Sequence, residues 1–153
     1  HVNSRRQRQM CIRDSFVTLN PNCRLFLHEF WANYQYKHEF NPPHWHGGLY
    51  SFVIWMKIPY SWEEQIELPQ FQTTKIQDRK AGMFEFEYSD TRGETRSLSY
   101  QLSPDFEGCM CFFPAWMRHA VYPFFGTDEE RVSISGNIWY TPGTSSGKGF
   151  GSK

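Results

Sequence analysis

The feature that most limits the fold of this chain is a series of short apolar runs, each bounded by turn residues. Residues 49–58 (LYSFVIWMKI) lie between two glycines and Pro59, and their length and composition predict a central strand buried on both faces. In residues 83–88, Phe84, Phe86 and Tyr88 alternate with Glu85 and Glu87, which predicts a strand with two unlike faces. The chain shows no internal repeat and no long amphipathic helical pattern. The series therefore predicts a β-sandwich or barrel.

Five further segments are compatible with strands, and the polar stretch 60–82 predicts a loop or one short helix. The five segments are residues 30–36, 97–102, 108–113, 119–122 and 131–140.

The length of 153 residues suits one compact domain, which we expect to span residues 16–142. Residues 1–15 lack periodicity and contain MCIRDS, which resembles translated adapter sequence, so we expect a non-native or disordered segment there. Residues 143–153 are rich in Gly and Ser, which predicts a flexible tail.

The charge balance limits the classes of partner. Sixteen basic and sixteen acidic residues cancel, so no global field would draw the protein to nucleic acid or to an anionic membrane. No apolar run approaches the ~20 residues that a membrane-spanning helix needs, and the first residues are polar and basic, unlike a signal peptide. We expect a cytoplasmic protein with no nucleic-acid or membrane partner; its oligomeric state is not encoded in any pattern we find.

The first candidate for chemistry is His44-Trp45-His46, just before the apolar strand. Residues two apart on an extended segment project to the same face, so both imidazoles can reach one ion. Neutral imidazole suits Fe, Zn, Cu or Ni. The motif is weak by itself, because H-x-H pairs also occur by chance on surfaces.

Two later segments add to it. In GCMCFFPAWMRHAVYP, residues 108–123, a glycine opens an apolar strand, a proline-containing turn follows, and His119 begins the next strand. In residues 131–137, alternation places Arg131 and Ser133 on one polar face, where the guanidinium could pair bidentately with a carboxylate and the hydroxyl could add a hydrogen bond. The alternative is a solvated outer face with Arg131 paired to Glu129 or Glu130.

Order and spacing together resemble the Fe(II)/2-oxoglutarate-dependent oxygenase superfamily over roughly residues 30–140. The segments that carry the resemblance are NPPHWHGGLYSFVIWMKIP, GCMCFFPAWMRHAVYP and ERVSISGNI. It implies a double-stranded β-helix (a jelly-roll or cupin-like barrel) that uses Fe(II), O₂ and 2-oxoglutarate and hydroxylates a substrate with release of succinate and CO₂. It also implies that His119 is the distal metal ligand and that Arg131 and Ser133 hold the C5 carboxylate of 2-oxoglutarate.

One departure from the family pattern leaves the ligand set open, because the usual acid two residues after the first histidine is His46 here. His44, His46 and His119 could form a three-histidine site. Alternatively, His46 could be the first ligand with Gly48 in the place of the acid, as in related halogenases. A third possibility is an acid from elsewhere, such as Glu39, and a fourth is a site with no functional metal.

Two other functions compete with the oxygenase. A cupin-like metal-binding protein would use H-x-H without 2-oxoglutarate, but the acid that usually follows the cupin H-x-H is missing. A structural or sugar-binding jelly roll would leave the three histidines scattered. The substrate class stays open between a small molecule, a peptidyl side chain and a nucleobase. Trp45, Tyr50 and Trp55 are candidates for the pocket wall.

Overall fold

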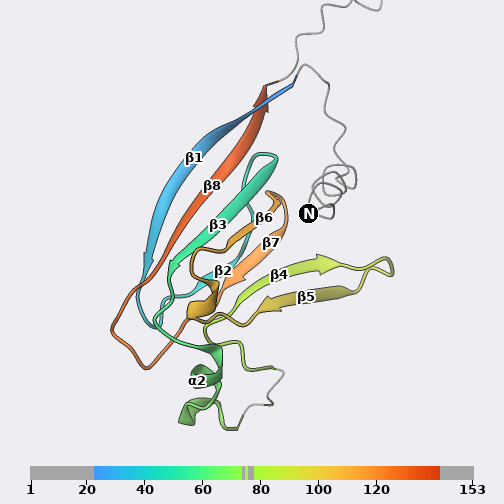
Figure 1. Cartoon of the computed structure of the whole chain (residues 1–153). Coiled ribbons are helices and arrows are strands. Elements are labelled where there is room, and N and C mark those ends of the chain that lie inside the picture. Colours follow the sequence, from blue (N-terminus) through green and yellow to red (C-terminus); the bar gives the residue numbers. More distant parts are fainter. Residues whose placement is uncertain (1–22, 74, 76–77, 142–153) are drawn as a thin grey trace, which may run out of the picture. The chain divides into compact units, whose positions relative to one another are not determined.

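The structure is a computed structural model that describes residues 23–73, 75 and 78–141, and its regular elements are mainly β (Figure 1). Its strands form two four-stranded antiparallel sheets, in agreement with the predicted double-stranded β-helix. The first sheet has the order β1 (Arg24–Gln35), β8 (Arg131–Thr141), β3 (Tyr50–Lys57), β6 (Met110–Pro114). The second has the order β2 (Asn41–His44), β7 (Arg118–Val121), β4 (Phe84–Ser89), β5 (Thr95–Tyr100).

All the predicted strands are present, with ends that differ by a few residues. The largest difference is β1, which begins at Arg24 rather than at residue 30. The short strand β2 was not expected as a strand, because its sequence Asn-Pro-Pro-His reads as a turn. It pairs with β7 through a register shift between Asn41 and His44, which accommodates two prolines that cannot donate to a ladder.

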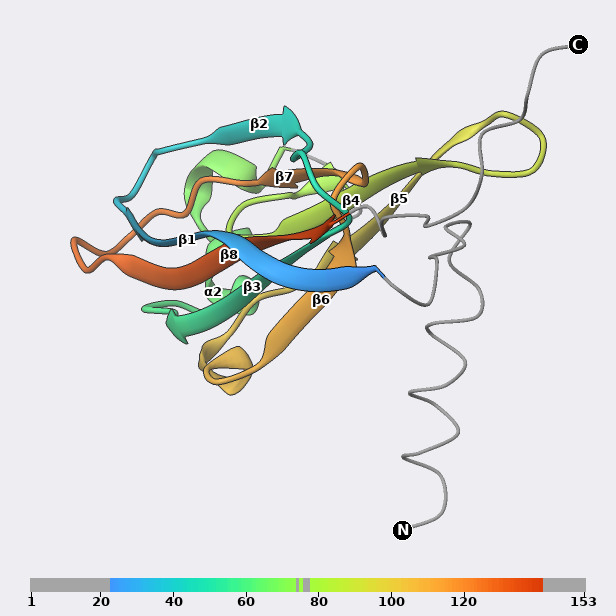
Figure 2. The same ribbon diagram turned by 90° about the horizontal axis from the view of Figure 1, so that it is seen from above.

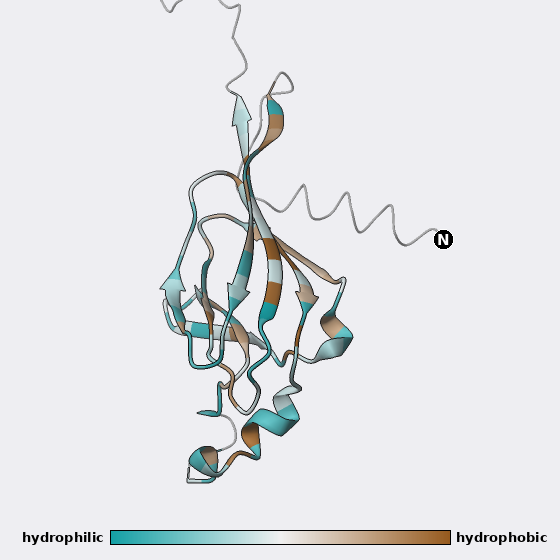
Figure 3. Cartoon of the chain, turned by 90° about the vertical axis from the view of Figure 1, so that its left-hand side faces the viewer, coloured by the Kyte–Doolittle hydropathy of each residue, from teal (hydrophilic) through white to brown (hydrophobic). Residues whose placement is uncertain are grey.

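The prediction that residues 49–58 are buried on both faces is wrong for one face. β3 is central in its sheet, between β8 and β6, but only Ser51, Val53 and Trp55 are buried. Phe52 and Ile54 on the other face are only half-buried, and Met56 is exposed. Alternating hydrophilic and hydrophobic bands follow such strands in Figure 3.

The hydrophobic core lies between the two sheets. Trp55 of the first sheet meets Phe84 of the second edge-on, with ring centroids 5.7 Å apart, and Phe86 meets Phe113 at 4.8 Å. These edge-to-face pairs are the arrangement that aromatic quadrupoles favour. The aromatic-rich sequence thus joins the two sheets through interlocking rings.

The polar stretch 60–82 contains the short helix α2 (Trp62–Ile66) and the 3₁₀ turn η1 (Pro69–Phe71). Helix α2 begins with a capping box, in which Ser61 and Glu64 each bond to the other's backbone N–H. A second 3₁₀ turn, η3 (Pro104–Phe106), leads into β6. None of the helices in the described part of the chain combines the length and the apolar character needed to cross a membrane.

The views in Figures 1 and 2 place β2 beside β7, as the pairing requires, and show β4 and β5 running out together as a hairpin. The expected non-native segment 1–15 and the expected tail 143–153 lie outside the described residues. The domain limits at 16 and 142 therefore stay predictions.

Candidate active site

His44 and His119 lie opposite each other on paired strands. They are Cα partners in the β2–β7 ladder, and their ring centroids are 4.3 Å apart. His119 is also the partner of Phe86 in β4, and it is surrounded by Phe84 and Phe113. Packed among these aromatic rings, His119 is only 4 % exposed.

His46 joins the pair from just beyond the end of β2. Its backbone N–H donates to the carbonyl of Ala115 at 2.9 Å, which fixes the segment against the β6–β7 turn. Its ring lies 5.1 Å from the rings of both His44 and His119 and 5.8 Å from that of Trp31. The extended backbone thus turns both imidazoles of the H-x-H motif to one side, as predicted.

Backbone carbonyls determine which ring nitrogen of two histidines is available. Nδ1 of His44 lies 2.7 Å from the Pro42 carbonyl, and Nδ1 of His119 lies 3.0 Å from the Met117 carbonyl. A carbonyl only accepts, so each Nδ1 carries the hydrogen and each Nε2 keeps a free lone pair. This is the orientation that metal-binding histidines usually receive from their outer partners.

Burial keeps His119 and His46 in the neutral form that binds metals. It lowers the pKa of His119 to about 4, with a smaller opposing contribution from the hydrogen bond to Met117. Burial and the neighbouring His44 also lower the pKa of His46, although the charge of Glu29 acts in the opposite direction. At neutral pH, His119 and His46 are therefore unprotonated and able to donate a lone pair.

The potential ligand atoms of His44, His46 and His119 all lie within 4.8 Å of one another, so one ion could bind all three. The structure thus brings together the three histidines that the jelly-roll alternative expected to be scattered. No carboxylate belongs to this group within the described residues. A set of three neutral imidazoles fits a borderline transition metal such as Fe(II) better than a hard ion such as Mg²⁺.

The other two ligand sets find less support. Glu39 lines the neighbouring cavity, but one carboxylate oxygen accepts the backbone N–H of Tyr36 at 2.8 Å and it is outside the metal-competent group. Gly48 has φ +103°, and a Cβ there would lie 2.8 Å from Nε1 of Trp139. The alternative with Gly48 in the place of the acid would also leave His44 beside the ion without a role.

Arg131 is at the start of β8 and is 3 % exposed, which contradicts the alternative of a solvated outer face. Its guanidinium donates to the side-chain oxygen of Gln35, to the hydroxyl of Tyr60 and to the carbonyl of Tyr122 at 3.3 Å. It also lies over the rings of Tyr60 and Phe124, with centroids at 5.8 and 5.6 Å. All of these partners are neutral.

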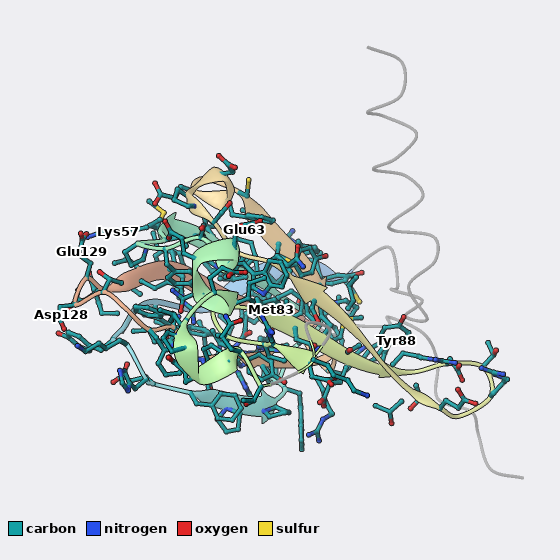
Figure 4. All side chains as sticks on the ribbon, turned by 90° about the horizontal axis from the view of Figure 1, so that it is seen from below. Lys57, Glu63, Met83, Tyr88, Asp128 and Glu129 are labelled. Carbon is teal, nitrogen blue, oxygen red and sulfur yellow. The ribbon has the colours of Figure 1, made fainter. Side chains whose placement is uncertain are left out.

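Neither of the two glutamates named in the alternative, Glu129 and Glu130, forms an ion pair with Arg131. Glu129 binds Lys57 at 2.7 Å, and Figure 4 shows the two labelled side chains together at the surface. Among the ion pairs of the described residues, none includes Arg131. Burial accordingly lowers the pKa of Arg131, with the interaction with Tyr60 opposing it. A buried guanidinium without a carboxylate is costly and predisposes the site to bind an anion.

The histidines and Arg131 line one cavity of about 650 Å³, a size typical of small-molecule sites. The inward face of β8 contributes Arg131, Ser133, Ser135 and Asn137 to its wall, as alternation predicted. Ser133 and Ser135 receive hydrogen bonds from the Asn33 amide at 3.4 and 3.2 Å. Of the three aromatic candidates for the wall, only Trp55 lines the cavity. Trp45 is 61 % exposed, and Tyr50 packs on Phe112 on the far face of the sheet.

The sequence argument missed the contribution of β1. Trp31, Asn33 and Gln35 alternate along this strand, and all three line the cavity. Their spacing of two could have indicated one functional face, but the strand is largely exposed and has no buried apolar series to mark its inner side. Tyr60, the hydrogen-bond partner of Arg131, comes from a loop for which periodicity gives no signal.

Comparison with known proteins agrees with this geometry. No curated protein matches the chain. A family model described as "Putative 2OG-Fe(II) oxygenase" matches residues 29–137, a range that contains all three histidines and Arg131. Because that match covers most of the chain, the protein belongs to this family of 2OG-Fe(II) oxygenases.

Proposed function

We propose that this protein is an Fe(II)- and 2-oxoglutarate-dependent dioxygenase that hydroxylates a small-molecule or peptidyl substrate and releases succinate and CO₂. In this proposal His44, His46 and His119 hold Fe(II), and Arg131 and Ser133 hold the C5 carboxylate of 2-oxoglutarate. Membership of the oxygenase family supports the reaction class. The histidine cluster supports the metal.

The observation that carries the proposal is the shared cavity. A group of three convergent imidazoles and a buried guanidinium with only neutral partners open into the same space. A dicarboxylic acid that chelates an ion at one end can neutralise Arg131 at its other end. The buried charge, costly in the empty cavity, then becomes a charge-assisted hydrogen-bond donor.

Each group has a distinct task in such a reaction. The iron, when bound, supplies the O₂ chemistry, and the protein binds and orients its partners. Three ligands on one side of an ion leave positions for the cosubstrate and O₂. Phe84, Trp55 and Phe113 line the cavity with apolar surface, which excludes water and strengthens the attraction between Arg131 and a carboxylate.

The cupin-like alternative would share the metal but not the cosubstrate. It gives no reason for a buried arginine that faces the metal-bearing cavity. We therefore rank it second.

A turnover assay tests the proposal. Purified protein is loaded with Fe(II) under anaerobic conditions, mixed with 2-oxoglutarate and exposed to air, and succinate is measured. We expect succinate that requires iron and O₂ and that disappears in the His46→Ala variant. Metal binding without 2-oxoglutarate binding would favour the cupin-like protein, and binding of neither would favour the structural jelly roll.

A further inference from the structure

The three-histidine site has an unbalanced charge. Its ligand atoms are all neutral, so a bound divalent ion would keep its full charge at a position where the family pattern has an acid. A cation in a partly buried site is stabilised by a nearby anion. Because the ligand set contains no carboxylate, such an anion would have to come from outside it.

Glu29 of β1 occupies a suitable position. It is two residues from Trp31, on the same side of the strand, and the Trp31 ring contacts that of His46. The Glu29 carboxylate accepts a hydrogen bond from the side-chain amide of Asn137. Asn137 lines the cavity, so the Glu29 carboxylate, which is exposed, lies beside the cavity wall on the side of Trp31 and His46.

The hydrogen bond to Glu29 has a buried, oriented donor. Asn137 is 2 % exposed, and its Oδ1 accepts from the hydroxyl of Ser51 at 2.7 Å. Because that bond fixes which end of the amide is oxygen, the NH₂ group has to point at Glu29. The chain Ser51–Asn137–Glu29 thus links β3, β8 and β1 and holds a carboxylate in one place.

Glu29 has no ion-pair partner and His46 has no backbone carbonyl at its ring, although comparable residues of the described chain have them. In the part of the chain that the structure describes, Glu29 forms no ion pair, whereas Glu85 and Glu129 each bind a lysine. Among the three described histidines of the site, only His46 has no backbone carbonyl at a ring nitrogen.

We propose that Glu29 is a positioning residue that supplies the missing negative charge from outside the ligand set, on the His46 side of the site. Ser51 and Asn137 hold the carboxylate for this task. Carboxylates and carbonyls are the usual outer partners of metal-binding histidines, and their loss typically costs about 10–100-fold in metal affinity. The inference rests on the metal site of the proposed function, but not on the use of 2-oxoglutarate.

The test is a Co(II) titration of the apoprotein, followed by calorimetry and by visible absorption. Glu29→Gln removes the charge but keeps an oxygen that can accept from Asn137, and we expect its affinity to fall about 10-fold. Glu129→Gln is the control, because Glu129 is exposed, binds Lys57 and is not among the residues that line the cavity. Its affinity should stay within about 2-fold of the wild type.

Two further measurements distinguish an effect of the Glu29 charge from a change in the structure of the metal site. The visible spectrum of bound Co(II) should be the same in the wild type and in Glu29→Gln, since the three ligands stay in place. The affinity difference should shrink as NaCl is raised, because salt screens a partly exposed charge. A changed spectrum would make Glu29 a direct ligand and overturn the proposal, as would equal affinities of the wild type and Glu29→Gln.

The outcome can be told apart from that of the proposed function. Weaker Co(II) binding by Glu29→Gln without any succinate formation by the wild type would support the role of Glu29 and reject the dioxygenase. Succinate formation with unchanged metal affinity in Glu29→Gln would do the reverse.

Discussion

His44 and His119 are cross-strand partners whose rings are oriented by the same kind of local hydrogen bond. Each ring donates its Nδ1–H to the carbonyl of the residue two positions earlier, Pro42 in one strand and Met117 in the other. The orientation of both Nε2 atoms therefore depends on short-range backbone geometry. Only the β2–β7 pairing is needed to bring the two rings within 4.3 Å of each other.

Loss of one imidazole should abolish tight metal binding. We expect His44→Ala to bind Co(II) at least about 100-fold more weakly, because two remaining ligands cannot enclose the ion. His44 is half-buried, so the melting temperature should change little. His28→Ala, which removes a histidine that contacts Trp139 but is outside the three-histidine group, should bind as the wild type does. Equal binding by both variants in calorimetry would contradict the ligand assignment.

Removal of the guanidinium should act on the cosubstrate alone. In Arg131→Ala we expect the Kd for 2-oxoglutarate to rise about 10–100-fold, the usual cost of one or two charge-assisted hydrogen bonds. Co(II) affinity should be unaffected. Arg118→Ala is the control, because Arg118 is exposed and its partner is Glu87. If Arg131→Ala bound 2-oxoglutarate normally, the assigned role of this residue would be wrong.

Glu85 should make stability depend on pH. Burial raises its pKa, but hydrogen bonds from Lys80 and Ser99 and the charge of Lys80 outweigh burial and hold the pKa below the ordinary 4.5. A folded-state pKa below the unfolded one gives a stabilisation that is complete above pH 4.5 and is lost as pH falls through the folded value. We expect Glu85→Gln to lower the free energy of unfolding by about 1–3 kcal/mol at pH 7.

The same variant should differ less from the wild type at pH 3 than at pH 7, because the stabilisation by the Glu85 charge is progressively lost as the pH falls below 4.5. Urea unfolding at the two pH values measures both differences. A destabilisation of equal size at pH 7 and pH 3 would show that the Glu85 charge is not responsible.

Gly48 should tolerate no side chain. Its φ is +103°, and a Cβ would lie 2.8 Å from Nε1 of Trp139 and 2.9 Å from the carbonyl of Ile138. We expect Gly48→Ala to lose about 2–4 kcal/mol of stability from strain and collision together. Gly93→Ala isolates the strain, since Gly93 also has a positive φ but nothing within 4 Å. Thermal unfolding should therefore rank Gly48→Ala well below Gly93→Ala, and similar melting temperatures would exclude the collision.

The fold was predictable because each strand carries its own signal. Alternation in Phe84–Ser89 and the apolar run of Tyr50–Lys57 are local patterns that determine which side chains face the core. β2 was missed for the opposite reason. Two prolines remove the local signal, and the strand exists because His44 and Asn41 pair with β7.

The residues of the candidate site fall into the same two groups, those with a local sequence signal and those without one. The two histidines of H-x-H and Arg131 were found because spacing places them on a face of a strand, and His119 because of its position after a proline turn. Gln35, Tyr60 and Glu29 were not found, because their part depends on which strands become neighbours. Sheet order is a long-range property that a local pattern does not contain.

The place of β1 at the edge of its sheet has a consequence for access to the cavity. Among the described strands it is bonded to β8 alone, and yet five of its residues, 31–35, line the cavity. An edge strand separates from its neighbour at a lower free energy than a central one does. The backbone amides of β1 should therefore exchange with deuterium sooner than those of β3, and a molecule held between Gln35 and Arg131 should slow them.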